Sequence, residues 1–293
     1  MKASGPKASS ALPPCVFLLA IPPLAHSIHR QMMIKDLPVT AFFPLVTSLL
    51  TPSTPLASRT LISLYIIHCA STAPELALLS INAYQKDLSD PQPLVRAGAI
   101  KTLAAMALPD IRSLVGVAVT KGARDTAWYV RRATADAVRA LWRADETYEN
   151  RTALLPTVIV LLNTASPLTI GSALEAWEAV CPARWDLLHP GYRKWCRMLM
   201  DVEEWGQCVL LRVLLRYART FFVDPRTTAV LDPDLQLLLM GSEQLLQHLN
   251  PAVSPVVQSR DGADEDRRSF RASSSCTTTS PLPPASPRSF DLF

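Results

Sequence analysis

One pattern, an Asp followed five residues later by Val-Arg, occurs twice in the chain and constrains the fold more than any other feature. It stands in DPQPLVRAGAIKTL, which begins at Asp90, and in DTAWYVRRATADAV, which begins at Asp125, and 125 − 90 gives a period of 35 residues. Self-similarity at such a period is typical of repeat proteins in which each unit is one supersecondary element. A single helix pair cannot bury its apolar face, so neighbouring units must stack on it.

Two weaker copies flank this pair. One is TPLASRTLISLY, from Thr54, and the other is SPLTIGSALEAW, in which Ile170-Gly171 replaces Val-Arg. The pattern resembles HEAT-type helical repeats, whose periods are about 40 residues. An Asp before the helix can cap free backbone N–H groups, the apolar residue before Arg packs inward, and the Arg reaches acidic groups of its own or the next repeat. The residues predicted to have these structural roles are Asp90, Val95, Arg96, Asp125, Val130 and Arg131.

Prolines divide the sequence into pieces of helical length. Proline is tolerated in the first turn of a helix and breaks its interior. Apolar residues at helical spacing follow several prolines, which predicts about ten helices between residues 40 and 249; these prolines are Pro74, Pro93, Pro109, Pro167 and Pro233. The chain has only 9 glycines, too few for a turn-rich β fold. We therefore predict an all-α protein, a right-handed α–α superhelix of the HEAT/armadillo-like solenoid class.

The composition divides the chain into three parts. Residues 1–29 are predicted to be irregular, because prolines interrupt the apolar stretch 11–25 and favour this interpretation over a signal peptide. Residues 30–250 form the helical-repeat part. Residues 251–293 are rich in Ser, Thr, Pro and charge, which predicts a disordered tail. Its last four residues, FDLF, resemble a short endocytic motif, although chance explains such a short pattern better. No apolar run is long enough to span a bilayer.

We find no sequence pattern typical of a catalytic, cofactor or metal site. HExxH, GxGxxG and GxSxG are absent. The segment GVAVTKG (116–122) has its lysine before the second glycine and follows a helical pattern, so it cannot form a phosphate-binding loop. The six cysteines have no CxxC pair, which favours a reduced, cytosolic protein. The sequence therefore predicts no enzyme and no cofactor.

Two basic clusters are candidates for contact with an acidic partner or with phosphoinositide headgroups. The first has three arginines on one face of a helix, and the second lies beside Trp195. The candidate residues are Arg212, Arg216, Arg219, Arg193, Lys194 and Arg197. Internal ion pairs or a solvated face are the alternative. The net charge of +4 is too small to indicate nucleic-acid binding. The six tryptophans either fill gaps between repeats or anchor an interface.

Several long segments resemble the adaptin family. LALLSINAYQKDLSDPQPLVRAGAIKTLAAM (76–106) and WYVRRATADAV (128–138) are similar to successive adaptin repeats. The stretch 178–207 ends in EWGQ, an element shared among beta adaptins, and the run before it is similar to the beta subunit of the third type of adaptor complex. The resemblance covers about residues 30–250 and implies part of the N-terminal trunk, a curved helical solenoid. Residues 1–25 and the chain beyond 250 depart from the family pattern.

The resemblance implies a structural role in a heterotetrameric vesicle-coat adaptor complex. Its partners would be a second large, a medium and a small subunit, together with an Arf-family GTPase and peripheral contact with a membrane. Such a complex works on the cytoplasmic side of Golgi or endosomal membranes and sorts proteins toward the lysosome or vacuole. The alternative is a stand-alone helical-repeat protein-binding scaffold. A binding solenoid of that kind carries Asn or Trp at equivalent positions in each repeat, whereas the tryptophan spacing here is not constant.

Overall fold

The computed structural model describes residues 40–51, 53–223 and 231–246. Within these ranges the chain forms twelve α-helical segments and four short 3-10 helices, and no strand is present in them. The irregular start predicted for residues 1–29, the tail predicted for 251–293 and its FDLF motif lie outside the described residues.

The helices, in chain order, are η1 (Thr40–Phe42), α3 (Phe43–Ser48), α4 (Leu56–Thr72), α5 (Pro74–Leu78), α6 (Ile81–Asp87), α7 (Pro93–Ala105), η2 (Pro109–Ile111), α8 (Arg112–Gly122), α9 (Trp128–Ala144), α10 (Tyr148–Asn163), α11 (Ile170–Val180), η3 (Trp185–Leu187), α12 (Tyr192–Arg197), η4 (Leu199–Asp201), α13 (Glu204–Phe221) and α14 (Pro233–Leu246). Four of the five prolines expected to begin helices do so, at α5, α7, η2 and α14. Pro167 instead lies in the turn before α11, and Pro156 is tolerated inside α10, where it is exposed.

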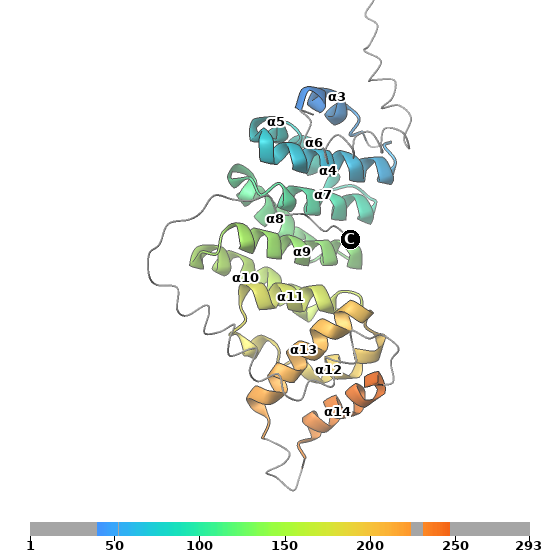
Figure 1. The fold of residues 1–293 in the computed structure, drawn as a ribbon, viewed down its shortest axis with the longest axis vertical. Coiled ribbons are helices and arrows are strands. Elements are labelled where there is room, and N and C mark those ends of the chain that lie inside the picture. Colours follow the sequence, from blue (N-terminus) through green and yellow to red (C-terminus); the bar gives the residue numbers. More distant parts are fainter. Residues whose placement is uncertain (1–39, 52, 224–230, 247–293) are drawn as a thin grey trace, which may run out of the picture.

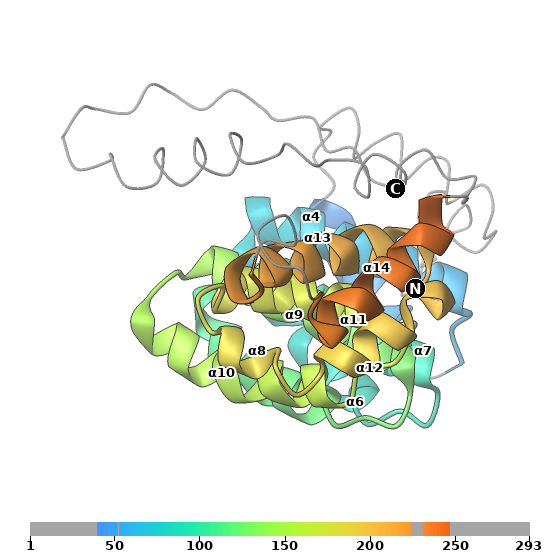
Figure 2. The same ribbon diagram turned by 90° about the horizontal axis from the view of Figure 1, so that it is seen from below.

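The helices stack as a two-layered solenoid (Figures 1 and 2). The first layer consists of α4, α7, α9, α11 and α13, and each of these helices packs on the one before it. The second layer contains α6, α8, α10 and α12, which pack on the flanks of the first layer. The predicted all-α solenoid is therefore confirmed.

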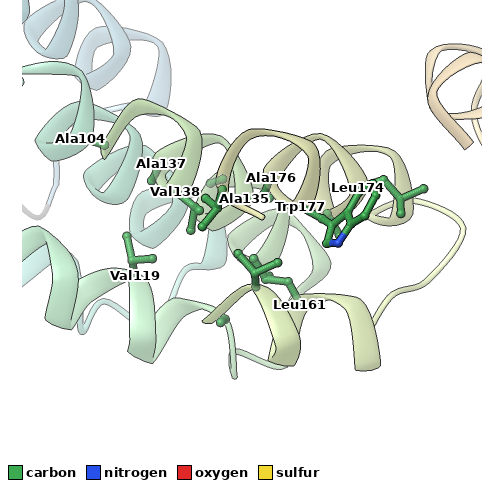
Figure 3. Close-up of a cluster of buried hydrophobic side chains, with 14 of the residues drawn as sticks. Ala104, Val119, Ala135, Ala137, Val138, Leu161, Leu174, Ala176 and Trp177 are labelled. Atoms are coloured by element: carbon green, nitrogen blue, oxygen red, sulfur yellow. The ribbon is translucent and has the colours of Figure 1, made fainter. Parts of the chain in front are cut away.

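Small side chains allow the first-layer helices to approach closely. Ala133 and Ala137 of α9 are fully buried, as are Ala173 and Ala176 of α11. In Figure 3 such alanines lie among larger buried side chains, including that of Trp177. The buried apolar residues form one continuous cluster along the described part of the stack. Burial of each large apolar side chain contributes about 1.5–3 kcal/mol, so this cluster supplies the main stabilising free energy.

The residues that fill the contact between α11 and α13 differ in size from one end of the helices to the other. Near the start of both helices, a Cβ atom built on Gly171 would lie 2.7 Å from the Cα atom of Gly206. Toward their other ends, large aromatic rings occupy the same interface. The ring centroid of Trp185 is 5.2 Å from that of Trp177 and 6.2 Å from that of Tyr217. Glycine therefore permits a close approach at one end, and aromatic rings fill a wider space at the other.

Arg96 joins two successive repeats. Its guanidinium donates 2.9 Å hydrogen bonds from Nε and Nη2 to the two carboxylate oxygens of Asp125, in the turn of the next repeat. Its Nη1 also donates to the backbone oxygens of Asp90 and Pro91, in the turn of its own repeat, at 2.8 and 3.0 Å. A bidentate guanidinium–carboxylate pair fixes both distance and orientation. Arg96 thus sets the register between the repeats that contain α7 and α9.

The arginines that correspond to Arg96 in the flanking repeats, Arg131 and Arg59, have different partners. Arg131 donates to the backbone oxygens of Asp125 and Thr126 at 2.9 Å, but its Nε is buried without a hydrogen-bond partner. In the next copy of the motif Ile170-Gly171 replaces Val-Arg, so Ala165 stands where the earlier copies have Asp, and Arg131 lacks the carboxylate acceptor that Arg96 has. In the preceding repeat, Arg59 binds the Asp87 carboxylate at 2.6 Å.

The two motif aspartates do not cap the following helices as the sequence suggested. The N-cap positions of α7 and α9 are Gln92 and Ala127, and neither makes a side-chain capping bond. Asp90 and Asp125 instead accept hydrogen bonds from the N–H groups of these two residues, at 2.8 and 2.9 Å. Each aspartate therefore closes the turn that precedes its helix, because it lies two residues before the N-cap position. Val95 and Val130 are buried.

Substitution of Asp125 tests the connection between repeats. Burial alone would raise the pKa of this carboxyl group, but hydrogen bonds from Arg96 and Ala127 and the charges of Arg96 and Arg131 outweigh it, so the pKa is lowered. Its stabilising contribution is therefore complete above the ordinary aspartate pKa and disappears as the pH falls through the lowered value. We expect Asp125→Ala to reduce the free energy of unfolding by about 2 kcal/mol at neutral pH.

Urea unfolding of both proteins, followed by circular dichroism at pH 7 and pH 3, measures this difference. The deficit of the variant should shrink at pH 3. Asp186→Ala is the control, because Asp186 pairs with Arg184 on an exposed surface and surface pairs contribute little. A deficit that stays constant with pH, or an equal effect of Asp186→Ala, would contradict the assigned role of Asp125.

Substitution of Gly171 tests the close approach of α11 and α13. In Gly171→Ala the new methyl group meets backbone rather than a movable side chain, so the helices must separate. We expect a loss of about 1–3 kcal/mol in the free energy of unfolding. Gly98→Ala in α7 is the matched control, because a Cβ atom there meets nothing within 4 Å and alanine favours a helix. The midpoint of thermal unfolding should fall for the first variant and should not fall for the second.

Candidate partner-binding surface

The first predicted basic cluster is engaged largely within the solenoid. Arg212 and Arg216 of α13 both bind Glu178 of α11, each with a nitrogen–oxygen distance of 2.7 Å. The guanidinium of Arg216 also lies 5.5 Å from the ring centroid of Trp185, within the range of a cation–π interaction. Arg219 is exposed near the end of α13. This cluster therefore strengthens the α11–α13 contact.

The second cluster, on α12, connects to different parts of the chain. Arg193 binds both carboxylate oxygens of Asp234 at the start of α14, at 2.7 and 3.1 Å. The amino group of Lys194 donates to the backbone oxygen of Ala165, at 3.0 Å. Arg197 is exposed and makes no hydrogen bond or ion pair with another described residue.

Among the described residues no hydrogen bond or ion pair joins the two clusters: the first pairs with α11 and the second with α14. The internal ion pairs that sequence reasoning kept as the alternative are thus present for Arg193, Arg212 and Arg216. A role of these six residues in membrane or partner contact stays a prediction.

The tryptophans divide into buried and exposed positions. Trp177 and Trp195 are buried, and the indole N–H of Trp177 donates to the backbone oxygen of Arg184 at 3.2 Å. Trp205 differs, since 73% of its surface is exposed in the first turn of α13. It belongs to the EWGQ element and directly precedes Gly206, which faces α11. A side chain with this much apolar surface in water is a candidate interface anchor.

A groove of about 1260 Å³ lies between α8 and α10 in the second layer. Its walls include Gly116, Val117 and Ala153, and charged residues gather at its two ends. Sequence analysis missed it, because α8 and α10 are separated by an entire first-layer helix. The segment 116–122 lies within α8, as its helical pattern predicted, and Gly116 opens onto the groove.

Metal-ligand groups, cysteine thiols and membrane-spanning helices can each be assessed for the described residues. No group of three or more His, Cys, Asp or Glu side chains among them is arranged to hold a metal ion. Burial raises the pKa of the Cys181 and Cys196 thiols to about 11, so they are protonated at neutral pH and weak nucleophiles. Within the same ranges, no helix combines the length and apolar character that crossing a bilayer requires.

Comparison with known proteins finds similar sequences in beta subunits of AP-3 complexes from different organisms. The AP-3 complex subunit beta-1 of Homo sapiens is 35% identical over 223 residues, which cover 67% of this chain and 20% of that protein. The AP-3 complex subunit beta of Schizosaccharomyces pombe is 32% identical over 229 residues, or 78% of this chain and 29% of that protein. The chain thus spans less than a third of the length of these relatives.

A similar structure is a chain of the full-length AP-3 complex, a homology model in an intermediate open conformation. It has a TM-score of 0.57 and 25% identity, covering 85% of this chain and 45% of that chain. Residues 30–256, more than half of the 293, match the family model described as the adaptin N terminal region. With its stacked two-layer helices and its EWGQ segment, this chain belongs to the adaptin family.

Proposed function

We propose that the chain is a structural, non-catalytic subunit of a heterotetrameric adaptor complex in vesicle-mediated protein transport. Its partners are a second large subunit, a medium subunit and a small subunit. The complex acts on the cytoplasmic side of Golgi or endosomal membranes, in transport toward the lysosome or vacuole. The observation that carries this proposal is the adaptin match over residues 30–256, together with relatives that are beta subunits of AP-3 complexes.

The architecture supports a scaffold role. An α-solenoid presents long, continuous surfaces because each repeat contacts only its neighbours. The guanidinium–carboxylate pair of Arg96 and Asp125 fixes the spacing of the repeats that contain α7 and α9, and the pair of Arg59 and Asp87 ties α4 to the end of α6. A rigid array of this kind holds other folded subunits by shape and requires no cofactor.

Membrane contact and an Arf-family GTPase belong to the same proposal. Arg197 and Arg219 are exposed on α12 and α13, and basic side chains near an anionic leaflet contribute about 1 kcal/mol each. So small a number of charges supports peripheral contact only when other subunits also bind the membrane. The alternative function, a stand-alone helical-repeat scaffold for protein partners, would use the same surfaces without forming a heterotetramer.

Co-expression with the second large, medium and small subunits of an AP-3 complex separates the two functions. We expect stoichiometric recovery of this chain in one complex, measured by size-exclusion chromatography and mass spectrometry. Expression of the chain alone is the control for its folding and solubility. A well-folded chain that elutes separately from the other three subunits would contradict the adaptor function and favour the stand-alone scaffold.

Substitution of Trp205 tests a specific anchor for this assembly. We expect Trp205→Ala to leave the thermal unfolding midpoint nearly unchanged, because its side chain is mostly in water. If the indole is an interface hot spot, its loss costs at least about 2 kcal/mol and weakens subunit binding about 30-fold. Val223→Ala, at another exposed apolar position, is the matched control. Unaltered subunit affinity of Trp205→Ala in a titration would remove Trp205 from the interface.

A further inference from the structure

The middle of the groove between α8 and α10 is partly apolar, because Val117, Ala153 and Leu154 line it together with Thr120 and Thr157. Asp145, in the short connection between α9 and α10, pairs with Arg112 at the start of α8, at 2.7 Å, so α8 and α10 begin at the same end. Val117 exposes 68% of its surface along the groove, where Gly116 and Ala153 also contribute walls. A Cβ atom on Gly116 would meet nothing within 4 Å, so this part of the wall is open space. The 11 residues of α8 give the groove a length of about 16 Å.

The two ends of the groove carry opposite charge. At the C-terminal end of α8, Lys121 and Arg124 are exposed, and neither forms an ion pair with another described residue. The amino group of Lys121 donates a hydrogen bond to the hydroxyl of Ser89, at 3.2 Å. At the other end, the Asp145 carboxylate is matched by Arg112, whereas Glu149 is exposed and unpaired with any described cation. Two positive charges therefore remain at one end and one negative charge at the other.

We propose that this groove binds an amphipathic helix of a partner protein, with acidic residues in its first turn and basic residues in its last. The acidic end lies beside Lys121 and Arg124, the basic end lies beside Glu149, and the apolar stripe covers Val117 and Ala153. The bound helix thus runs antiparallel to α8 and α10. The proposal uses residues outside those considered for the adaptor assembly and does not depend on that function.

Three physical arguments favour a helix over another occupant. Acidic residues at the N-terminus and basic residues at the C-terminus stabilise an isolated helix, so this charge order accompanies a helix that forms readily. Antiparallel alignment places the positive N-terminal end of its dipole near the negative C-terminal ends of α8 and α10. A groove between two helices with an apolar strip and charged ends also matches the helix-in-groove mode of recognition, with anchors spaced at i, i+3, i+4 and i+7.

A synthetic peptide provides a direct probe. It has about 14 residues, glutamates in the first turn, lysines in the last turn and a Leu/Ala stripe at i, i+3, i+4 and i+7. The matched peptide has the glutamates and lysines exchanged, and the same hydrocarbon staple holds both peptides helical. Fluorescence anisotropy with the full chain at low salt should show about tenfold tighter binding of the first peptide.

Two variants test where the peptide binds. Gly116→Leu places a side chain in the wall of the groove, where a Cβ atom meets nothing within 4 Å, and we expect it to abolish binding. Gly98→Leu is its matched control, because Gly98 also has nothing within 4 Å but lies on α7, away from the groove lining. The double variant Lys121→Glu/Arg124→Glu should weaken binding of the first peptide about tenfold. Circular dichroism melts establish that each variant is folded.

The expected pattern is preference for the first peptide, loss in Gly116→Leu and retention in Gly98→Leu. Absence of binding to the unmodified chain at about 1 mM peptide, where the binding free energy is only about 4 kcal/mol, would overturn the proposal. Equal affinity for the two peptides would overturn the proposed orientation. Binding that persists in folded Gly116→Leu would place the peptide on another surface and also overturn it.

Discussion

The apolar contact between successive first-layer helices is the interaction on which the remaining structure depends. The apolar side chains of a helix such as α9 are buried by α7 and α11 on its two sides, and the second-layer helices α8 and α10 also pack on it. No repeat is therefore stable by itself, and the array stabilises each unit through its neighbours. Apolar attraction has little directional preference, however, so it holds the helices together without determining how they slide past one another.

Directional polar contacts fix this register between the helices. Arg96 binds the turn of its own repeat and the Asp125 carboxylate of the next, so two turns and two helices share one side chain. Arg59 binds the backbone oxygen of Thr51, before its own helix, and the carboxylate of Asp87 at the end of α6. These pairs are mostly shielded from water, and their value lies in fixing register as much as in free energy. The exposed surfaces, including Trp205 and the α8–α10 groove, are then held at fixed positions along the stack.

The sequence predicted the fold because the signal is local and repeated. Proline positions and helical spacing depend on neighbouring residues, and four of the five expected proline starts are found at helix starts. The candidate partner-binding surface could be predicted from the sequence only in part. The pairing of Arg212 and Arg216 with Glu178 depends on how α11 and α13 pack, and the groove depends on the distance between α8 and α10. Neither relation leaves a fixed spacing in the sequence. Trp205 lies in a recognisable motif, but its exposure follows from which face of α13 meets α11.

The α11–α13 contact has a further consequence for the shape of the array. Gly171 and Gly206 occupy almost no volume at the start of these helices, whereas Trp177, Trp185 and Tyr217 occupy a large volume toward their other ends. Two rods separated by a small spacer at one end and a large spacer at the other form a wedge. A wedge between two stacked helices tilts the second relative to the first, so the gradient of side-chain size between α11 and α13 sets the direction in which the later helices continue. Replacing a residue at either end of that gradient would change the tilt between α11 and α13 and would therefore reorient the surfaces that follow.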